Sequence, residues 1–312
     1  CFNAFFPSKQ HIVGVSHASS FDCVAKYFNL HVFILNMRIF IEQFLMRKIT
    51  VVTTFPPHAY ETYAKRMLEN FDKNWPQDIK LLCYYEQTKP DVASARIEYR
   101  DLEALAPALV DFKTRHKDNP HANGQSPYKD KKSYLWDAVR FAHKTFCVDH
   151  AGRNCGDTDI LIWCDADTVT FKPITQDFLE TLLPEDAYCS YLGRTQMYPE
   201  CGWVMYDVKS KWHDKFLQTW TDFYTTDSIF KELEFHDSYI WEQTRKRLAE
   251  QGMKHHNITP NHPHRPGVHV FINGPLGEYI DHLKGPRKKL GSSKKSDIYN
   301  PKSDAYWSKL NA

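Results

Sequence analysis

The stretch Asp159-Ile160-Leu161-Ile162-Trp163-Cys164-Asp165-Ala166-Asp167-Thr168-Val169 says most about the fold of this chain. Its apolar run ends abruptly in two carboxylates one residue apart, which indicates a buried strand that ends at the edge of a sheet. Because alternate residues of a strand point to the same face, Asp165 and Asp167 are expected to lie on one side. Two hard oxygen ligands placed in this way suit Mg²⁺ or Mn²⁺, although acidic pairs also occur in solvated loops.

A second polar segment lies near the other end of the chain and reads His282-Leu283-Lys284-Gly285-Pro286-Arg287-Lys288. It combines an imidazole ligand, a glycine that permits close backbone approach and cations suited to phosphate. Together the two segments predict a site for a metal-bound diphosphate.

With these two motifs the chain resembles nucleotide-sugar glycosyltransferases of the GT-A fold, such as glycogenin and the bacterial lipopolysaccharide galactosyltransferases. The resemblance covers roughly residues 46 to 290. It implies an α/β, Rossmann-like fold with a mixed, mainly parallel sheet flanked by helices in a single domain. It also implies that Asp165, Asp167 and His282 bind Mn²⁺ or Mg²⁺, that Gly285 and Lys288 contact the diphosphate, and that the donor is a nucleotide sugar, most simply a UDP-sugar.

Composition and charge allow this interpretation. The 312 residues, 42% of them hydrophobic, suffice for one large α/β domain, and a formal charge of +2 provides no strong overall field for nucleic acid. The eight cysteines have no C-x-x-C spacing and are expected to be reduced thiols. We therefore expect a cytoplasmic protein, in the host cytoplasm if the protein is viral.

Residues 1 to 45 are expected to be an N-terminal extension outside the native fold, with Met46 as the natural start. Their apolar stretch, residues 31 to 45, is interrupted by Arg38, Glu42 and Gln43 too early for a membrane span of about 20 apolar residues. An amphipathic helix is the preferred interpretation, and no membrane span is predicted.

From residue 48 the chain alternates between strand and helix patterns. The β-branched run 49–55 predicts a strand, residues 58 to 74 a helix, and residues 79 to 85 a second strand parallel to the first. Because ligands of open α/β sheets bind at the carboxyl ends of the strands, Thr53, Thr54 and Glu86 are candidates for nucleotide contacts. They could equally be ordinary polar residues at strand ends.

Later segments add candidates on both sides of the predicted site. A loop over 118–126 precedes a predicted helix with an apolar stripe from Leu135 to Phe146, and Lys132 at its edge could neutralise phosphate or extend into solvent. A short helix over 175–183 and strands over 188–192 and 199–206 are expected to follow. Gly202 would let a sugar or acceptor approach the backbone, and Glu200 could bind hydroxyls.

Asp237 is the first choice for an acid on the acceptor side, as a general base or as a polar contact, with helix capping as the competing interpretation. Residues 291 to 312 form a basic C-terminal tail. The predicted acceptor is a glycan, a protein or a hydroxymethylated base in DNA, because the architecture also resembles that of glucosyltransferases that modify such bases. The five histidines between residues 255 and 269 fit no zinc-ligand spacing and predict a surface or site-covering loop.

Two other classes remain open at the level of sequence. The segment around Asp165 also resembles the nucleophile motif of haloacid-dehalogenase-like phosphatases, although that motif normally follows the first strand and needs a later pair of acids. A noncatalytic nucleotide-sugar-binding protein would keep the donor pocket without turnover.

Overall fold

The structure is a computed structural model that describes residues 46–260, 269–299, 302 and 306. The chain divides into two units, Cys1–Met46 and Arg47–Ala312, and the second contains almost all of the described residues. The predicted N-terminal extension, residues 1 to 45, lies outside them. No helix in the described ranges is long and apolar enough to cross a membrane.

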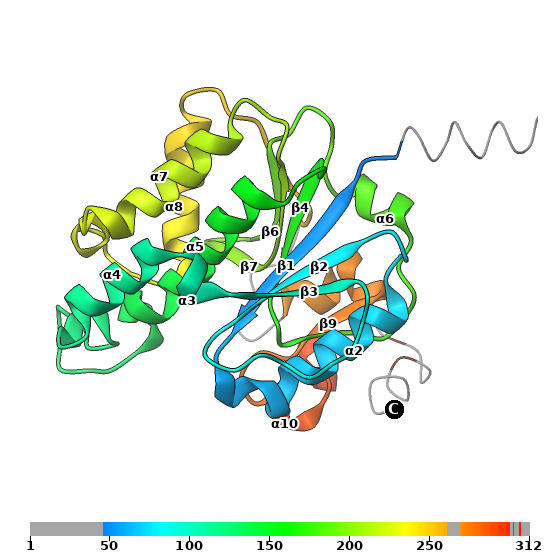
Figure 1. Ribbon diagram of the computed structural model, residues 1–312, viewed down its shortest axis with the longest axis horizontal. Helices are drawn as coiled ribbons and strands as arrows, with labels where there is room; N and C mark the ends of the chain where they lie inside the picture. The colour runs from blue at the N-terminus through cyan, green and yellow to red at the C-terminus, as the bar shows by residue number, and fades with distance from the viewer. Residues whose placement is uncertain (1–45, 261–268, 300–301, 303–305, 307–312) are drawn as a thin grey trace, which may run out of the picture. The chain divides into compact units, whose positions relative to one another are not determined.

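The second unit is built on a seven-stranded sheet with the order β3-β2-β1-β4-β7-β6-β8 (Figure 1). Strand β1 pairs in parallel with β2 and β4, β2 with β3, and β6 with β8, whereas β7 runs antiparallel to β4 and β6. The sheet is therefore mixed and mainly parallel, as predicted. The strands are β1 Ile49–Phe55, β2 Lys80–Tyr85, β3 Ile97–Asp101, β4 Ile160–Cys164, β6 Cys189–Arg194, β7 Met197–Asp207 and β8 His255–Asn257.

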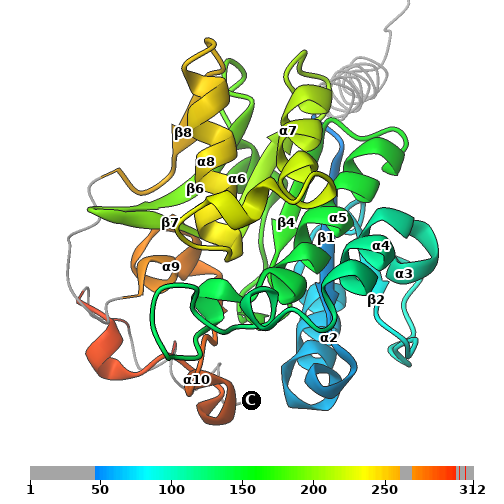
Figure 2. The same cartoon turned by 90° about the vertical axis from the view of Figure 1, so that its left-hand side faces the viewer.

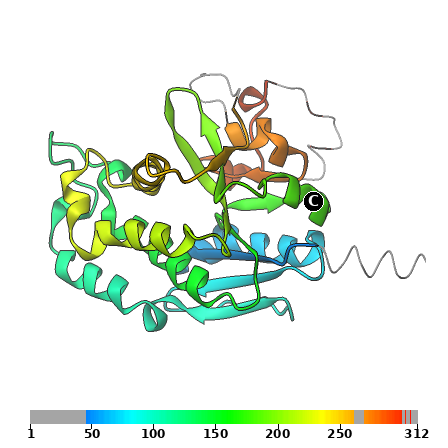
Figure 3. The same ribbon diagram turned by 90° about the horizontal axis from the view of Figure 1, so that it is seen from above.

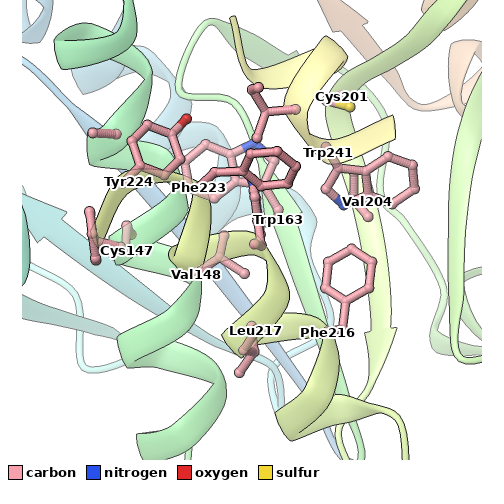
Figure 4. Close-up of a cluster of buried hydrophobic side chains, with 14 of the residues drawn as sticks. Cys147, Val148, Trp163, Cys201, Val204, Phe216, Leu217, Phe223, Tyr224 and Trp241 are labelled. Atoms are coloured by element: carbon pink, nitrogen blue, oxygen red, sulfur yellow. The ribbon is translucent and has the colours of Figure 1, made fainter. Parts of the chain in front are cut away.

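Helices cover both faces of this sheet because successive strand residues point to opposite sides. Val52 and Leu161 pack into one hydrophobic cluster, and their neighbours Val51 and Ile162 pack into the other. Figure 4 shows part of the first cluster, and Figures 2 and 3 show the layers from two further directions. The first face is covered by α4 Pro107–His116, α5 Ala138–Asn154, α7 His213–Thr225 and α8 Asp237–Ala249, and the second by α2 Lys65–Asn74, α6 Gln176–Thr181 and α9 Val270–Asn273.

The early predicted elements match the structure closely. The strand over 49–55 is β1, the strand over 79–85 is β2, and the two are parallel. The helix predicted over 58–74 is split into a 3₁₀ turn η1 (Pro57–Ala59), a π-helical turn η2 (Tyr60–Ala64) and α2. Strand β3 was not predicted; α3 (Leu102–Leu105) follows it, and Asp101 caps α3 by accepting from Ala104 N.

The segment before α5 differs from the predicted helix. The loop contains a 3₁₀ turn η3 (Pro120–Ala122), a second turn η4 (Tyr134–Trp136) follows, and α5 begins only at Ala138, where Asp137 accepts from the backbone N–H of Arg140. Ser133 caps η4 through its side chain. Lys132 therefore lies before the helix, in an isolated bridge with Gln125, and is exposed.

A second, two-stranded sheet holds the C-terminal part of the site. Strand β5 (Thr168–Thr170) pairs antiparallel with β9 (Ile280–His282). Asp281 is fully buried and accepts hydrogen bonds from Ser293 N (2.8 Å), Ser293 Oγ (2.6 Å) and Tyr306 OH (3.0 Å). These contacts tie the described residues after position 290 to β9. The remaining short elements are η5 Ser228–Lys231, η6 Pro275–Glu278, α10 Arg287–Leu290 and η7 Lys295–Asp297.

The turn η6 leads directly into β9, and Gly277 within it has no room for a side chain. A Cβ atom there would lie 2.0 Å from the carbonyl oxygen of Ile272.

We expect Gly277→Ala to lower the free energy of unfolding by about 2 kcal/mol or more, since the obstructing atom is backbone. Chemical denaturation would measure the loss. Gly252→Ala, where a Cβ meets open space at a φ of +98°, is the matched control and should cost only about 1 kcal/mol. Equal losses for the two variants would contradict this account.

Candidate functional site

A cleft of about 610 Å³ opens where the parallel strands end. Thr54 and Phe55 reach it from the end of β1, Glu86 from the segment after β2, and Asp165 and Asp167 from the segment after β4. The carboxyl ends of neighbouring parallel strands meet at one edge of a sheet, which is where open α/β sheets bind ligands.

Three side chains at this edge could hold one metal ion. Ligand atoms of Asp165, Asp167 and His282 all lie within 4.8 Å of one another. His282 Nε2 is 2.9 Å from Asp167 Oδ1 and 3.5 Å from Asp165 Oδ2. Two carboxylates and one imidazole suit Mn²⁺ or Mg²⁺. The structure thus brings the two predicted carboxylate ligands together with His282, which lies more than a hundred residues later in the sequence.

The pairing of β5 with β9 explains how His282 reaches the carboxylates. Thr168 is the register partner of His282, so the imidazole lies beside the end of the D-x-D segment. Gly202 on β7 leaves the space that the ring occupies, because a Cβ atom there would lie 2.6 Å from His282 Cε1 and 3.3 Å from Asp165 Oδ2. Gly202 was predicted to let a sugar or acceptor approach; in the structure the closest approach to it is made by His282.

The ionisation of the cluster depends on its charges more than on its burial. Burial lowers the pKa of His282, but Asp167, Glu200 and Asp165 outweigh burial and raise the pKa above its ordinary value. Burial also disfavours the charged form of Asp167, yet His282 and Lys288 hold the pKa of this carboxyl below its usual range. Both pKa shifts therefore favour the charged forms of the acid and the imidazole.

The loop after β9 places a further cation at the cluster. Gly285 has a φ of +61°, in the left-handed region that favours glycine, and its carbonyl accepts from Lys288 N. The turn directs Lys288 Nζ to within 3.0 Å of Asp167 Oδ2 and 4.0 Å of the centre of the Tyr63 ring. Lys288 and Tyr63 both line the cleft. Gly285 thus allows the turn, and Lys288 places its positive charge beside Asp167.

Asp237 opens α8 and lines the same cleft. Its Oδ2 is 2.7 Å from Nζ of Lys144, a buried lysine of α5. Lys144 Nζ also lies 3.2 Å from Asp165 Oδ1 and donates to the carbonyl of Cys201. Burial raises the pKa of Asp237, but Lys144, His236 and Lys284 together lower it below its ordinary value. Asp237 is therefore a carboxylate paired with a lysine rather than a helix cap.

Glu200, the other predicted acid, does not line the cleft. It is 3% exposed, with its carboxylate 3.1 Å from Lys284 Nζ and 3.6 Å from Arg194 Nη1. Its Oε1 is 3.8 Å from His282 Nδ1. Burial raises the pKa of Glu200, but Lys284, His282 and Arg194 together lower it well below its ordinary value. Glu200 thus lies on the Nδ1 side of the His282 ring, whereas Asp167 lies on the Nε2 side.

The predicted nucleotide contacts divide in the structure. Thr54 and Glu86 line the cleft, with Thr54 Oγ1 donating to Tyr84 O (2.7 Å) and Glu86 Oε1 lying 2.8 Å from His143 Nδ1. Thr53 is fully buried and points away from the strand face that carries Thr54. Lys132 is not among the residues that line the cleft.

Several other side chains that line the cleft were not predicted from the sequence. The cleft is also lined by Arg140, Lys144, His143 and Tyr63. Arg140, His143 and Lys144 recur at spacings of three and four within α5. Polar residues at helical spacing opposite the apolar stripe of α5 were the available signal.

The histidine-rich segment is only partly described. His262 and His264 lie outside the described residues. His255 accepts from Arg245 Nη1 at 2.6 Å, and the ring of the buried His269 lies 5.4 Å from the ring of His282. Burial and the charge of His282 lower the pKa of His269 to about 3. Among the described residues, the only group with metal-ligand geometry is the one formed by Asp165, Asp167 and His282.

Gly202→Ala tests the geometry of the metal cluster. The added methyl group would push His282 away from Asp165, so we expect affinity for Mn²⁺ to fall about tenfold or more. Calorimetric titration with Mn²⁺ would measure this, with Met197→Ala, an exposed position on the same strand, as the matched control. Unchanged metal affinity in Gly202→Ala would show that His282 is not a ligand.

Lys144→Met tests the pairing of charges. Removing the cation leaves Asp237 and Asp165 without their shared partner. We therefore expect the free energy of unfolding to fall by about 3 to 5 kcal/mol at neutral pH. The lowered pKa of Asp237 means that the paired carboxylate stabilises the fold above its unfolded-state pKa, and this contribution is lost as the pH falls through the folded-state value. Protonation of Asp237 in the variant should therefore shrink the difference from wild type in acid.

Denaturation of both proteins at neutral and at mildly acidic pH, with a chelator present, would measure this difference. Lys231→Met, at an exposed position, is the control and should change little at either pH. A loss in Lys144→Met that stays constant across the pH range would contradict the pairing.

No protein-family model matches the sequence, and no curated protein matches it. Among solved structures, apo mouse xyloside xylosyltransferase 1 is similar with a TM-score of 0.40 and 12% identity, covering 68% of this chain and 84% of that one. A glycosyltransferase involved in the glycosylation of the major capsid of PBCV-1 has a TM-score of 0.42 and 10% identity, covering 78% of this chain and 99% of that one. At this distance neither likeness assigns a function to the chain.

Proposed function

We propose that the protein is a metal-dependent glycosyltransferase that moves a sugar from a nucleoside diphosphate donor, a UDP-sugar, to an acceptor hydroxyl. The observation that supports the proposal is that Asp165, Asp167 and Lys288 line a cleft at the carboxyl edge of the sheet, with the buried His282 beside the two carboxylates. Carboxylates and an imidazole suited to a divalent ion, next to a lysine, are the groups that a diphosphate requires.

The proposed transfer breaks the bond between the sugar C1 and a diphosphate oxygen and forms a bond between C1 and the acceptor oxygen. The nucleoside diphosphate leaves with the electron pair, and the acceptor hydroxyl releases its proton. A bound Mn²⁺ or Mg²⁺ would supply positive charge at the leaving diphosphate. Lys288 would donate to a diphosphate oxygen, and Arg140 would add positive charge from the opposite wall.

Asp237 would orient the acceptor hydroxyl. Its lowered pKa keeps it ionised at neutral pH, which suits a hydrogen-bond acceptor but weakens it as a base. Lys144 holds it in place and links it to Asp165. Thr54 and Glu86 would contact the nucleoside from the strand ends, and Glu200 would orient the imidazole of His282 from behind.

The make-up of the cluster favours this function over the phosphatase alternative. Asp165 Oδ1 accepts from Trp163 Nε1 (2.7 Å) and from Lys144 Nζ (3.2 Å), which leaves Oδ2, 3.5 Å from His282 Nε2, as the oxygen for a metal ion. The third residue of the cluster is also a histidine rather than a later acid. A cytoplasmic setting is part of the proposal, supported by the free thiols of the six described cysteines.

Thermal stabilisation by a panel of nucleotide sugars, with and without Mn²⁺, tests the proposal. We expect one donor to raise the melting temperature only when Mn²⁺ is present. Asp167→Ala should abolish this response because it removes a metal ligand, whereas Asp78→Ala, an exposed carboxylate, should keep it.

Transfer or donor hydrolysis would then be assayed with the donor that binds. Loss of turnover in Asp237→Asn with donor binding retained would separate an enzyme from a noncatalytic binding protein. Absence of a response to every donor, together with release of phosphate from a phosphomonoester, would refute the proposal in favour of the phosphatase.

A further inference from the structure

A group of aromatic side chains surrounds His236 next to the cleft. The centre of the His236 ring lies 5.8 Å from that of Tyr134, 6.2 Å from Phe141 and 5.5 Å from Tyr198. Tyr239 continues the group, with its ring 5.1 Å from Tyr198. We call these five residues the aromatic wall. Its members come from η4, α5, β7 and the start of α8, so segments far apart in the sequence converge there.

The aromatic wall is continuous with the cleft. Phe141 lines the cleft itself, and His236 immediately precedes Asp237, with 4.0 Å between His236 Nδ1 and Asp237 Oδ1. Tyr134, the outermost ring, is 59% exposed. A molecule that presents a hydroxyl to Asp237 would therefore extend over Phe141 and Tyr134, while the buried His236 and Tyr239 support these rings from below. The metal cluster and Lys288 contribute to the cleft from other elements, β4, β9 and α10.

Hydrogen-bonding groups border the rings. Glu234 Oε2 lies 2.8 Å from His236 Nε2, and Tyr239 OH is 3.3 Å from Glu232 Oε2. Glu232 is also paired with Arg247 (2.7 Å) and Asp237 with Lys144 (2.7 Å), so the acceptor oxygens beside the wall carry little net negative charge apart from that of Glu234. Flat apolar faces with acceptors at their edges match a pyranose ring, which has C–H groups on its face and hydroxyl donors around its rim.

We propose that the aromatic wall is the acceptor subsite and that it takes a neutral pyranose ring of a glycan. This inference rests on the proposed function, because it names the acceptor for that reaction. A neutral sugar fits better than a polyanion, because the wall contains no lysine or arginine and Glu234, whose ion pair among the described residues is with His236, would repel phosphate. The rings supply the contact area, and the carboxylates orient the hydroxyls.

A nucleic acid acceptor would use a neighbouring feature instead. Lys129, Lys131 and Lys132 are exposed on the hairpin that carries the exposed Tyr128. Cations with stacking rings are typical of single-strand binding, and such binding weakens steeply with salt. Dependence on salt therefore distinguishes the two acceptor classes.

The test is binding of the labelled full chain to an array of neutral glycans, with and without UDP and Mn²⁺. We expect binding to a subset of the glycans, nearly independent of salt. Tyr134→Ala should weaken it about tenfold, while Tyr134→Phe, which keeps the ring, should bind like wild type. Tyr134 is exposed, so both variants are expected to fold.

Asp167→Ala separates this inference from the proposed function. It should keep glycan binding in the absence of donor, because the metal cluster is not part of the wall. Donor stabilisation without glycan binding in any condition would overturn the acceptor inference and leave the proposed function standing. Glycan binding without any donor response would overturn the proposed function and leave the wall as a glycan-binding surface with no acceptor role. Salt-dependent binding to single-stranded oligonucleotides that is lost on replacing Lys129, Lys131 and Lys132 would also overturn the glycan assignment.

Discussion

The site depends on a pairing of only three residue pairs, between β5 and β9. These strands are short and lie outside the main sheet, yet their register alone places His282 against a carboxylate 115 residues earlier in the chain. A slip of one residue would turn the imidazole to the other face. Gly202 leaves the space that the His282 ring fills, and Gly277, just before β9, leaves the space that the backbone of Ile272 fills.

Four acids at or behind the cleft each lie beside a lysine, one of which is shared. Lys144 lies between Asp165 and Asp237, Lys288 serves Asp167, and Lys284 serves the buried Glu200. Buried carboxylates without partners would be protonated or would destabilise the fold, so these pairs are a condition for keeping several acids in so small a volume. The same pairs fix the direction of the electrostatic field before any substrate arrives, which reduces the reorganisation that chemistry would otherwise need.

Local patterns predicted the parts of the fold that are governed by local physics. The β-branched run of β1 and the continuous apolar run of β4 are typical of buried strands, and the structure confirms both. Strand β3 carries Glu98, Arg100 and Asp101 on a half-exposed edge, so its sequence lacks the apolar alternation that would reveal it. The start of α5 was placed too early because Ser133 and Asp137 cap two separate helical turns. For the site, the type and spacing of residues predicted Asp165, Asp167 and His282. Lys144 was missed because its role comes from the tertiary position of α5 beside two acids.

Asp281 connects the last described residues to the metal cluster. Its carboxylate receives Ser293 and Tyr306, and the next residue along β9 is His282. The last described segment is therefore mechanically coupled to the histidine through a single buried acid. A proteolytic cut or a frameshift before Tyr306 would remove one of these donors and act on the chemistry as an active-site lesion, although every residue of the cleft would be intact. In genetic terms, the site reaches beyond the residues that touch its ligands.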